Sequence, residues 1–190
     1  MKGIIRTSLM MLLVMTILTG VAYPLAVTGI AKTAFPAKAD GSLIERNGKV
    51  VGSELIGQQF DDPRYFWGRH SATAPFPYNA AASSGSNLGP LNPDLKKSVE
   101  KRVKHLRETN PENIRPIPID LVTASASGLD PDISPAAAGW QVTRVAKARG
   151  IPMQSVENIL GKYTKKRQFG LLGEHRVNVL ELNMALDLAR

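Results

Sequence analysis

A run of 25 residues without a charged side chain, residues 7–31, constrains this chain more than any other feature. It begins after Arg6 and ends before Lys32. A helix rises about 1.5 Å per residue, so about 20 apolar residues cross the hydrocarbon core of a bilayer. Backbone amides in hydrocarbon must be hydrogen bonded within the segment, which requires a helix. The sequence therefore predicts one membrane-spanning helix near the N-terminus.

The predicted span covers residues 9–31 and follows a short basic N-terminus, residues 1–8. Pro24 lacks the N–H that would complete one helical hydrogen bond, so we expect it to kink the last turns. The residues that mark the span are Leu9, Leu13, Ile17, Tyr23, Pro24 and Val27.

A cleaved signal peptide is the competing interpretation, because it shares the basic start and the apolar stretch. Here the apolar stretch continues past the usual length of a signal peptide. The best cleavage-like triplet, residues 37–39, lies far beyond the apolar centre of the segment. We therefore favour an uncleaved anchor.

The orientation of the span depends on the basic residues near its ends, since these prefer the cytoplasmic side. Lys2 and Arg6 precede the span, and Lys32 and Lys38 follow it, so this count is almost balanced. The short basic head and the long following domain favour an N-terminus inside the cell and residues 32–190 outside the cytoplasm.

Composition limits what residues 32–190 can be. Their length suffices for one compact domain with its own core. They hold 22 basic against 16 acidic residues, which fits anionic lipid, an acidic partner, nucleic acid or solubility alone. Behind a membrane anchor we expect lipid or a neighbouring subunit, and no nucleic acid. The chain has no cysteine, which excludes disulfides, thiol catalysis and cysteine metal ligands.

Turn and cap residues divide this domain into short elements. We expect a linker over residues 32–42, a hairpin turning at Asn47–Gly48, a loop over 70–92 (ordered or flexible), a helix from Pro93 to Asn110, a strand over 117–122, a helix over 135–149, a helix through 156–163 and a last helix opening at Asn178. The predicted fold class is α+β: one N-terminal transmembrane helix followed by a single mixed α/β soluble domain.

The sequence shows no catalytic set of residues. Ser98 and Lys101 match the serine–x–x–lysine pattern of penicillin-interacting enzymes, but the pattern lies within a helix and lacks its partner motifs. The three histidines are scattered along the chain. The small-residue loops 83–89 and 123–128 could bring backbone amides close to a phosphate or a protein, or could simply be tight turns. The residues alone indicate an accessory subunit or a binding module.

Several strings resemble the C subunit of the bacterial Kdp potassium-transporting ATPase, the KdpC family. They are Gly52–Gln58 (GSELIGQ), Tyr65–Thr73 (YFWGRHSAT), Asp120–Pro131 (DLVTASASGLDP) and Val177–Asn183 (VNVLELN). Their order and spacing hold over essentially the whole chain, including Tyr23-Pro24 in the span. His70 departs from the pattern, because the resemblance leads us to expect proline there.

The resemblance implies a subunit without catalysis of its own in an ATP-driven potassium uptake pump of the bacterial plasma membrane. Its partners would be a channel-like subunit that selects potassium, a P-type subunit that forms an aspartyl-phosphate, and a small stabilising subunit. The C subunit would be needed for assembly and activity, and could act as a catalytic chaperone that raises the affinity of the P-type subunit for ATP. The alternative function is a free-standing, membrane-anchored extracytoplasmic binding domain.

The resemblance also implies site residues. It implies no cofactor of the chain itself, while ATP contact within the complex would involve Ser127, Gly128 and Gln141. This role conflicts with a domain outside the cytoplasm, because ATP is cytoplasmic, and the predicted topology favours the outside placement. Docking contacts are expected from the helix 135–149 and the loop 69–87, which combine polar groups with aromatics. The residues chosen are Arg69, Ser71, Thr73, Tyr78, Asn87, Trp140 and Arg144.

Overall fold

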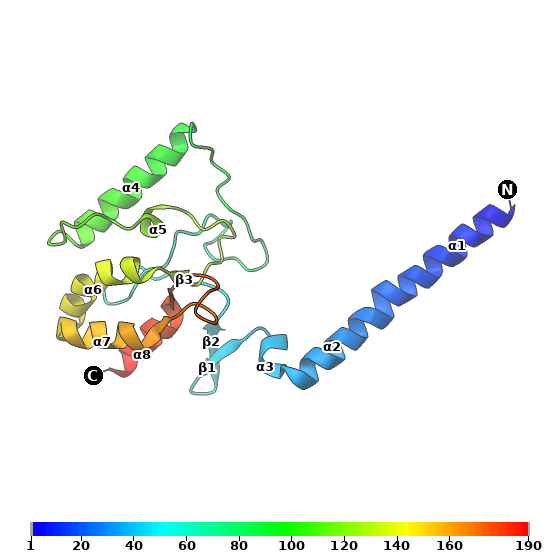
Figure 1. Ribbon diagram of the computed structural model, residues 1–190. Helices are drawn as coiled ribbons and strands as arrows, with labels where there is room; N and C mark the ends of the chain where they lie inside the picture. Colours follow the sequence, from blue (N-terminus) through cyan, green and yellow to red (C-terminus); the bar gives the residue numbers. More distant parts are fainter. Residues whose placement is uncertain (1, 190) are drawn as a thin grey trace. The chain divides into compact units, whose positions relative to one another are not determined.

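The computed structural model describes residues 2–189, which divide into two compact units between Val51 and Gly52. Figure 1 labels their helices and strands. The first unit begins with helix α1 (Lys2–Ile17), a π-helical turn (Leu18–Ala22) and helix α2 (Tyr23–Ala34). Among the described residues, the continuous helix Gly3–Ala34 is the one that is long and apolar enough to cross a membrane. This agrees with the predicted span, residues 9–31, which the helix extends by six residues at its N-terminal end and by three at its C-terminal end.

The π-helical turn explains how the helix passes Pro24. Proline cannot donate a backbone hydrogen bond, and a wider turn is one way in which a helix accommodates the loss. The turn lies immediately before α2, whose first turn contains Pro24. The predicted disturbance at Pro24 therefore takes the form of a π-helical turn, and the helix continues to Ala34.

The first unit continues with one helical turn, α3 (Pro36–Ala39), where the sequence predicted only a linker. Strands β1 (Leu43–Arg46) and β2 (Lys49–Ser53) follow and pair as a hairpin. Asn47 and Gly48 have φ angles of 54° and 73°, as a tight two-residue turn requires. The predicted hairpin is confirmed.

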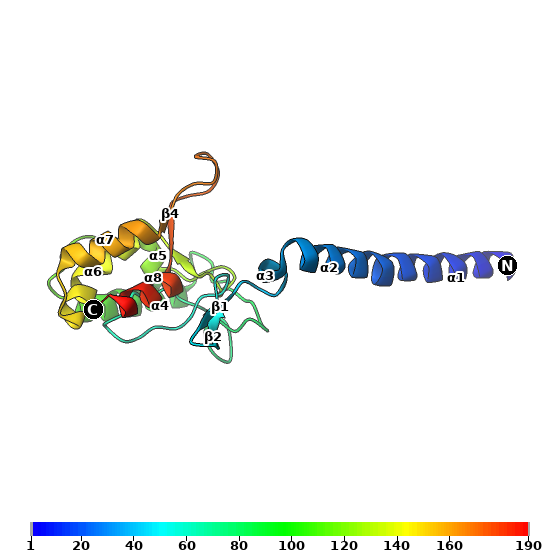
Figure 2. The ribbon, with the colours of Figure 1, turned by 90° about the horizontal axis from the view of Figure 1, so that it is seen from below.

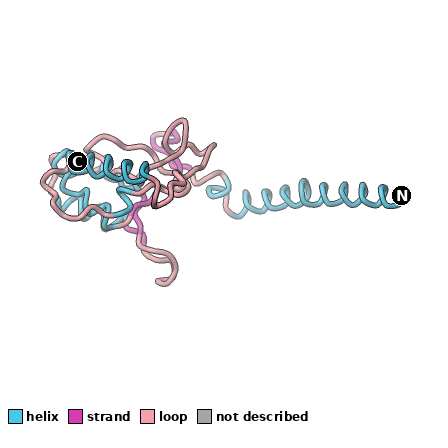
Figure 3. The backbone as a smooth tube through the Cα atoms, turned by 90° about the horizontal axis from the view of Figure 1, so that it is seen from above, coloured by secondary structure: helices cyan, strands magenta, loops and turns pink. Residues whose placement is uncertain are grey.

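The second unit contains five helices and three short strands among its described residues. The helices are α4 (Pro93–Thr109), α5 (Ile119–Val122), α6 (Pro135–Arg149), α7 (Met153–Tyr163) and α8 (Val179–Leu188). The strands are β3 (Asp132–Ile133), β4 (Thr164–Lys165) and β5 (Arg176–Asn178), in the antiparallel order β3-β5-β4. Val177 of β5 lies between Ile133 and Thr164 of its neighbours. Figures 2 and 3 show long loops joining these elements. The predicted α+β class is confirmed.

Local side-chain caps account for the start of three helices. Asn92, Ser134 and Asn178 each accept a backbone hydrogen bond from the first turn of the helix that follows, α4, α6 and α8 respectively. Gly150 ends α6 with a φ angle of 67°, in the left-handed region that glycine adopts without strain. The helix boundaries predicted at these residues are confirmed.

The strand predicted over residues 117–122 is wrong, because Ile119–Val122 forms the short helix α5. Leu121 is buried (6% exposed), while Ile119 is 75% exposed. The Asp120 carboxylate accepts a hydrogen bond of 2.8 Å from the Ser134 amide, at the start of α6. A helical turn places Leu121 in the core and Asp120 at this cap, and these tertiary contacts override the β-branched composition.

The core of the second unit is built by α6, α7, α8 and β5, together with the irregular segment that contains Phe66 and Trp67. Fully buried apolar side chains come from each of these elements: Phe66, Val145, Val156, Val177, Leu182 and Leu186. Because this core holds residues 66–67 in place, it also positions the candidate site next to them.

Candidate functional site

The segment Pro63–Trp67 belongs to no helix or strand and enters the core at Phe66 and Trp67. Backbone groups that are buried outside secondary structure must find their hydrogen bonds elsewhere. Here side chains supply them. The backbone oxygens of Pro63 and Tyr65 accept from Arg144, that of Arg64 from Arg149, that of Phe66 from Asn183 and that of Trp67 from Gln141. Five consecutive carbonyl groups are thus paired with side chains of α6 and α8.

Two side-chain amides also bond the N–H groups of this segment. The Asn183 amide pairs with both backbone groups of Phe66, at 2.8 and 2.9 Å. The Gln141 amide pairs in the same way with Trp67, at 2.9 and 3.1 Å. Both amides are almost fully buried. We call Gln141 and Asn183 the amide clamp.

The Trp67 ring lies between groups from two helices. The Arg144 guanidinium lies 3.9 Å from the ring centroid, and the His105 ring of α4 is stacked on it at 5.1 Å. Burial lowers the pKa of Arg144 to about 10, so the group stays charged at neutral pH. A desolvated guanidinium over an indole is a favourable cation–π contact. This contact and the stacked His105 hold Trp67 at the base of a cleft.

The cleft lies between α4 and the segment that follows β2, and has a volume of about 560 Å³. Its walls combine aromatic rings with basic groups, and Asp61 is their one carboxylate among the described residues. The lining residues are Gln59, Phe60, Asp61, Trp67, Gly68, Arg69, His70, Tyr78, Ser98, Lys101, Arg102, His105, Leu106 and Leu121. A concave surface of this composition suits an acidic or polar group of a ligand or a partner protein.

Three titratable groups in the cleft, His70, Tyr78 and Arg102, have shifted pKa values, and burial lowers the pKa of Arg102. Burial lowers the pKa of His70, and the charges of Arg102 and Lys101 lower it further, so His70 is neutral at pH 7. Burial also raises the pKa of Tyr78 to about 12. The Tyr78 hydroxyl donates to the backbone oxygen of Arg69. The positive charge of the cleft therefore comes from its lysine and arginine side chains.

Hydrogen bonds join the loop 69–87 to the loop 123–130. The Ser71 hydroxyl donates to the Gly128 oxygen at 2.7 Å and accepts from the Tyr78 amide at 2.9 Å. A Cβ atom at Gly128 would lie 2.5 Å from Thr73 Cγ2 and 2.6 Å from the Ser84 oxygen, and its φ angle is 69°. Glycine is therefore required at position 128 for the two loops to approach this closely.

The predicted docking residues have different environments. Ser71, Thr73, Trp140 and Arg144 are buried, and the polar groups among them bond other parts of the domain. Arg69 and Tyr78 are partly buried and line the cleft, and Asn87 is exposed. Arg69 also forms an ion pair of 2.9 Å with Asp130. Among these seven residues, Arg69, Tyr78 and Asn87 have the surface to touch a partner directly.

The predicted nucleotide residues belong to two separate hydrogen-bond networks. Ser127 is exposed, and its neighbour Gly128 is buried in the contact between the two loops. Gln141 has no exposed surface, and its amide bonds the Trp67 backbone. None of the three lines the cleft.

Sequence reasoning missed several cleft residues. Lys101 was noted only in the discounted serine–x–x–lysine pattern, Arg102 was not singled out, and the histidines, among them His70 and His105, were set aside as scattered. Ser98 and Lys101, of the discounted four-residue motif, both line the cleft. Ser98, Lys101, Arg102 and His105 recur at helical spacing on α4, but the surface that they face was not visible in the sequence.

Known proteins resemble this chain over its full length. Residues 5–188 match the family model described as "K+-transporting ATPase, c chain". The chain belongs to the KdpC family. It is 60% identical over 185 residues to the potassium-transporting ATPase KdpC subunit of Methylococcus capsulatus, covering 97% of both chains. The KdpC subunit of Burkholderia vietnamiensis is 58% identical over 190 residues, which is all of this chain and 98% of the relative. The resemblance found in the sequence strings is confirmed, and the KdpC match includes the apolar helix as well as the second unit.

Proposed function

We propose that this chain is an accessory subunit, without catalysis of its own, of a bacterial potassium-transporting ATPase. It would assemble with a channel-like potassium-selecting subunit, a P-type subunit and a small stabilising subunit, and would be needed for their assembly and activity. The full-length match to the KdpC family carries this proposal. A relative that shares both the span and the domain is expected to share the use of both.

The cleft beside α4 is the docking surface that the geometry favours. It presents Arg69, Lys101 and Arg102 around an aromatic floor, and Asp61 is the one negatively charged residue that the described part of the chain adds to the lining. Because the domain is tethered to the membrane of its partners, even a modest contact becomes effectively intramolecular. We therefore propose that an acidic or polar segment of another pump subunit binds in the cleft.

We place the chain in the plasma membrane with residues 32–190 outside the cytoplasm. The apolar helix supports a single-pass anchor. A role as a catalytic chaperone would then act through the complex, with the docked subunit raising the affinity of the P-type subunit for ATP. Direct nucleotide contact is the less favoured form of this role, because Gln141 is buried and already paired. The chain would need no cofactor of its own.

Purification in mild detergent tests the proposal. We expect the tagged chain to retain the other pump subunits, because the family match implies a shared complex. The tagged chain is extracted from intact membranes. If it then purifies as a lone monomer, the result would instead support the alternative, a free-standing extracytoplasmic binding domain.

A pair of charge reversals on α4 tests the cleft. Lys101→Glu should reduce the amount of co-purifying partner severalfold, since it places a negative charge in the basic cleft. Lys97→Glu is the matched control, because Lys97 lies on the same helix, is exposed and does not line the cleft. Equal recovery of partner subunits with both variants would contradict docking at this surface.

Labelling of an introduced cysteine tests the topology. The chain has no native cysteine, so Ser84→Cys gives a single reactive site on an exposed loop. A membrane-impermeant maleimide should label this variant in intact spheroplasts. Gly3→Cys, which precedes Arg6 and the uncharged run, should be labelled only after lysis. The reverse pattern would place the domain in the cytoplasm and would favour the nucleotide role.

A further inference from the structure

The loop between β4 and β5, residues 166–175, projects from the body of the second unit (Figures 2 and 3). Its tip carries three large apolar side chains that contribute almost nothing to the core. Phe169 is 92% exposed, Leu171 79% and Leu172 60%. Apolar groups gathered on an exposed projection mark a surface that binds something. We call these three residues the apolar tip.

Backbone hydrogen bonds hold the apolar tip in one shape. The Gln168 amide donates to the Leu172 oxygen, and the Leu172 amide donates back to the Gln168 oxygen, each at 2.9 Å. Phe169 has a φ angle of 54°, which is costly for a bulky side chain. A shaped turn thus presents the phenylalanine to solvent.

Ion pairs tie the base of the loop together. Arg167 Nη2 lies 2.7 Å from both carboxylate oxygens of Glu174 across the loop. Lys165 pairs with Glu54 and Glu181 on the body of the domain, at 2.7 and 3.1 Å. These contacts keep the loop extended away from the domain, so the apolar tip does not fold back onto it.

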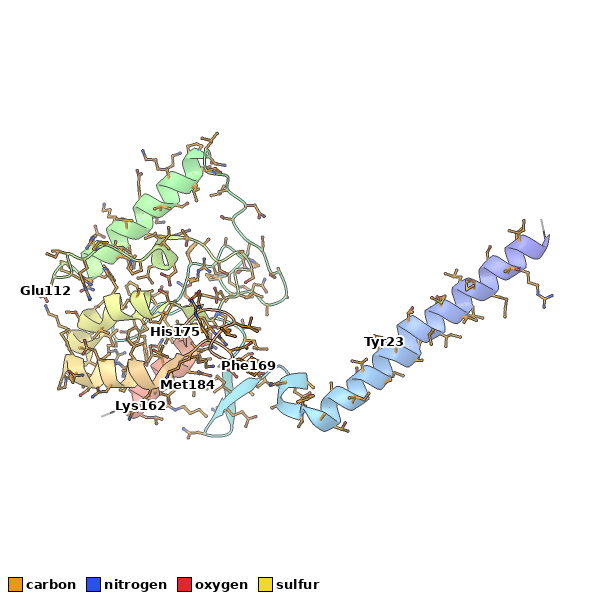
Figure 4. The ribbon with its side chains drawn as sticks, viewed as in Figure 1. Tyr23, Glu112, Lys162, Phe169, His175 and Met184 are labelled. Atoms are coloured by element: carbon orange, nitrogen blue, oxygen red, sulfur yellow. The ribbon has the colours of Figure 1, made fainter. Side chains whose placement is uncertain are left out.

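Two basic side chains flank the loop without a carboxylate partner among the described residues. Lys166 begins the loop and Lys162 lies in the last turn of α7, and both are exposed. Figure 4 labels Lys162 on α7, and Phe169 and His175 on the loop. Phenylalanine and leucine with nearby lysines form the combination by which peripheral segments bind the headgroup region of an anionic bilayer.

We propose that the apolar tip inserts into the surface of the bilayer that carries the N-terminal helix, with Lys162 and Lys166 against anionic headgroups. The same chain contains the helix Gly3–Ala34, so the domain stays within a tether's reach of that bilayer. The loop is a small convex projection, and a fluid lipid surface can deform around such a shape without a preformed pocket. This second contact with the membrane would limit the orientations of the domain, and it does not depend on the proposed role in the pump.

A dye at the tip tests the insertion. The full-length variant Leu171→Cys is labelled with an environment-sensitive nitrobenzoxadiazole dye and reconstituted alone into liposomes of phosphatidylethanolamine and phosphatidylglycerol. We expect a blue-shifted emission and strong quenching by lipids brominated on their acyl chains. The same dye on Ser86→Cys, an exposed position in another loop of the unit, should show neither effect.

Two further samples separate insertion by the protein from insertion by the dye. In the labelled Leu171→Cys chain, replacing Phe169 and Leu172 by serine should remove most of the quenching. Replacing phosphatidylglycerol by phosphatidylcholine should weaken it. The absence of quenching in liposomes would overturn the proposal. Quenching or a blue shift that arises only when the other pump subunits are present would overturn it as well, and would assign the tip to a protein partner.

Discussion

Deleting residues 32–190 while keeping the membrane span is expected to abolish potassium-stimulated ATP hydrolysis by the assembled pump. The physical reason is that the domain holds the cleft with Arg69, Lys101 and Arg102, whereas the span alone offers an apolar helix without charge over residues 7–31. The measurement is the phosphate released by the purified complex, with and without potassium. Activity equal to that of the intact complex would show that the domain is dispensable.

The chain purified alone is the control for this experiment, and it should hydrolyse no ATP. Ser98 and Lys101 make this control informative, because both line the cleft and match a catalytic pattern. Turnover by the isolated chain that disappears in Ser98→Ala would contradict a docking role, since it would assign catalysis to the cleft itself.

Asn183→Ala is expected to lower the free energy of unfolding of the second unit by about 2–5 kcal/mol, because it leaves two buried backbone groups of Phe66 unpaired. This is a large part of the 5–15 kcal/mol typical of a domain. Both tryptophans, Trp67 and Trp140, are buried in this unit. Tryptophan emission during a urea titration of the full chain in detergent therefore reports the unfolding of this unit alone.

Asn158→Ala is the matched control, because Asn158 is exposed on α7 and, among the described residues, its side chain bonds only that of Gln154. Its effect should stay within about 0.5 kcal/mol. An equal effect of the two variants would show that the amide clamp does not stabilise the domain.

Gln141→Ala extends this prediction to the residue that the family resemblance connects with nucleotide. If Gln141 acts through the amide clamp, the variant should destabilise the domain in the same range as Asn183→Ala. A variant that keeps full stability but lowers the affinity of the complex for ATP would instead favour direct nucleotide contact.

Local signals in the sequence were sufficient for the span and for most of the helices. The uncharged run of residues 7–31 predicts a membrane helix, because the cost of charge in hydrocarbon acts on each residue separately. Asn92, Ser134 and Asn178 predict helix starts, because a cap bonds an amide two or three residues away. The end of α6 at Gly150 and the turn at Asn47–Gly48 are also local features, because each depends on the φ angles of single residues.

The site depends on contacts between residues far apart in the chain, and no local pattern encodes these. Gln141 meets Trp67 across 74 positions, and Asn183 meets Phe66 across 117. These bonds bury Gln141, which the family resemblance suggested for nucleotide contact, and Asn183, for which no contact was predicted. The same kind of contact turned Ile119–Val122 from the predicted strand into a helix, through Leu121 in the core and Asp120 at the α6 cap. Composition and spacing thus set most of the elements, whereas packing between them decided the form of residues 119–122, which polar residues stabilise the domain and which line the cleft.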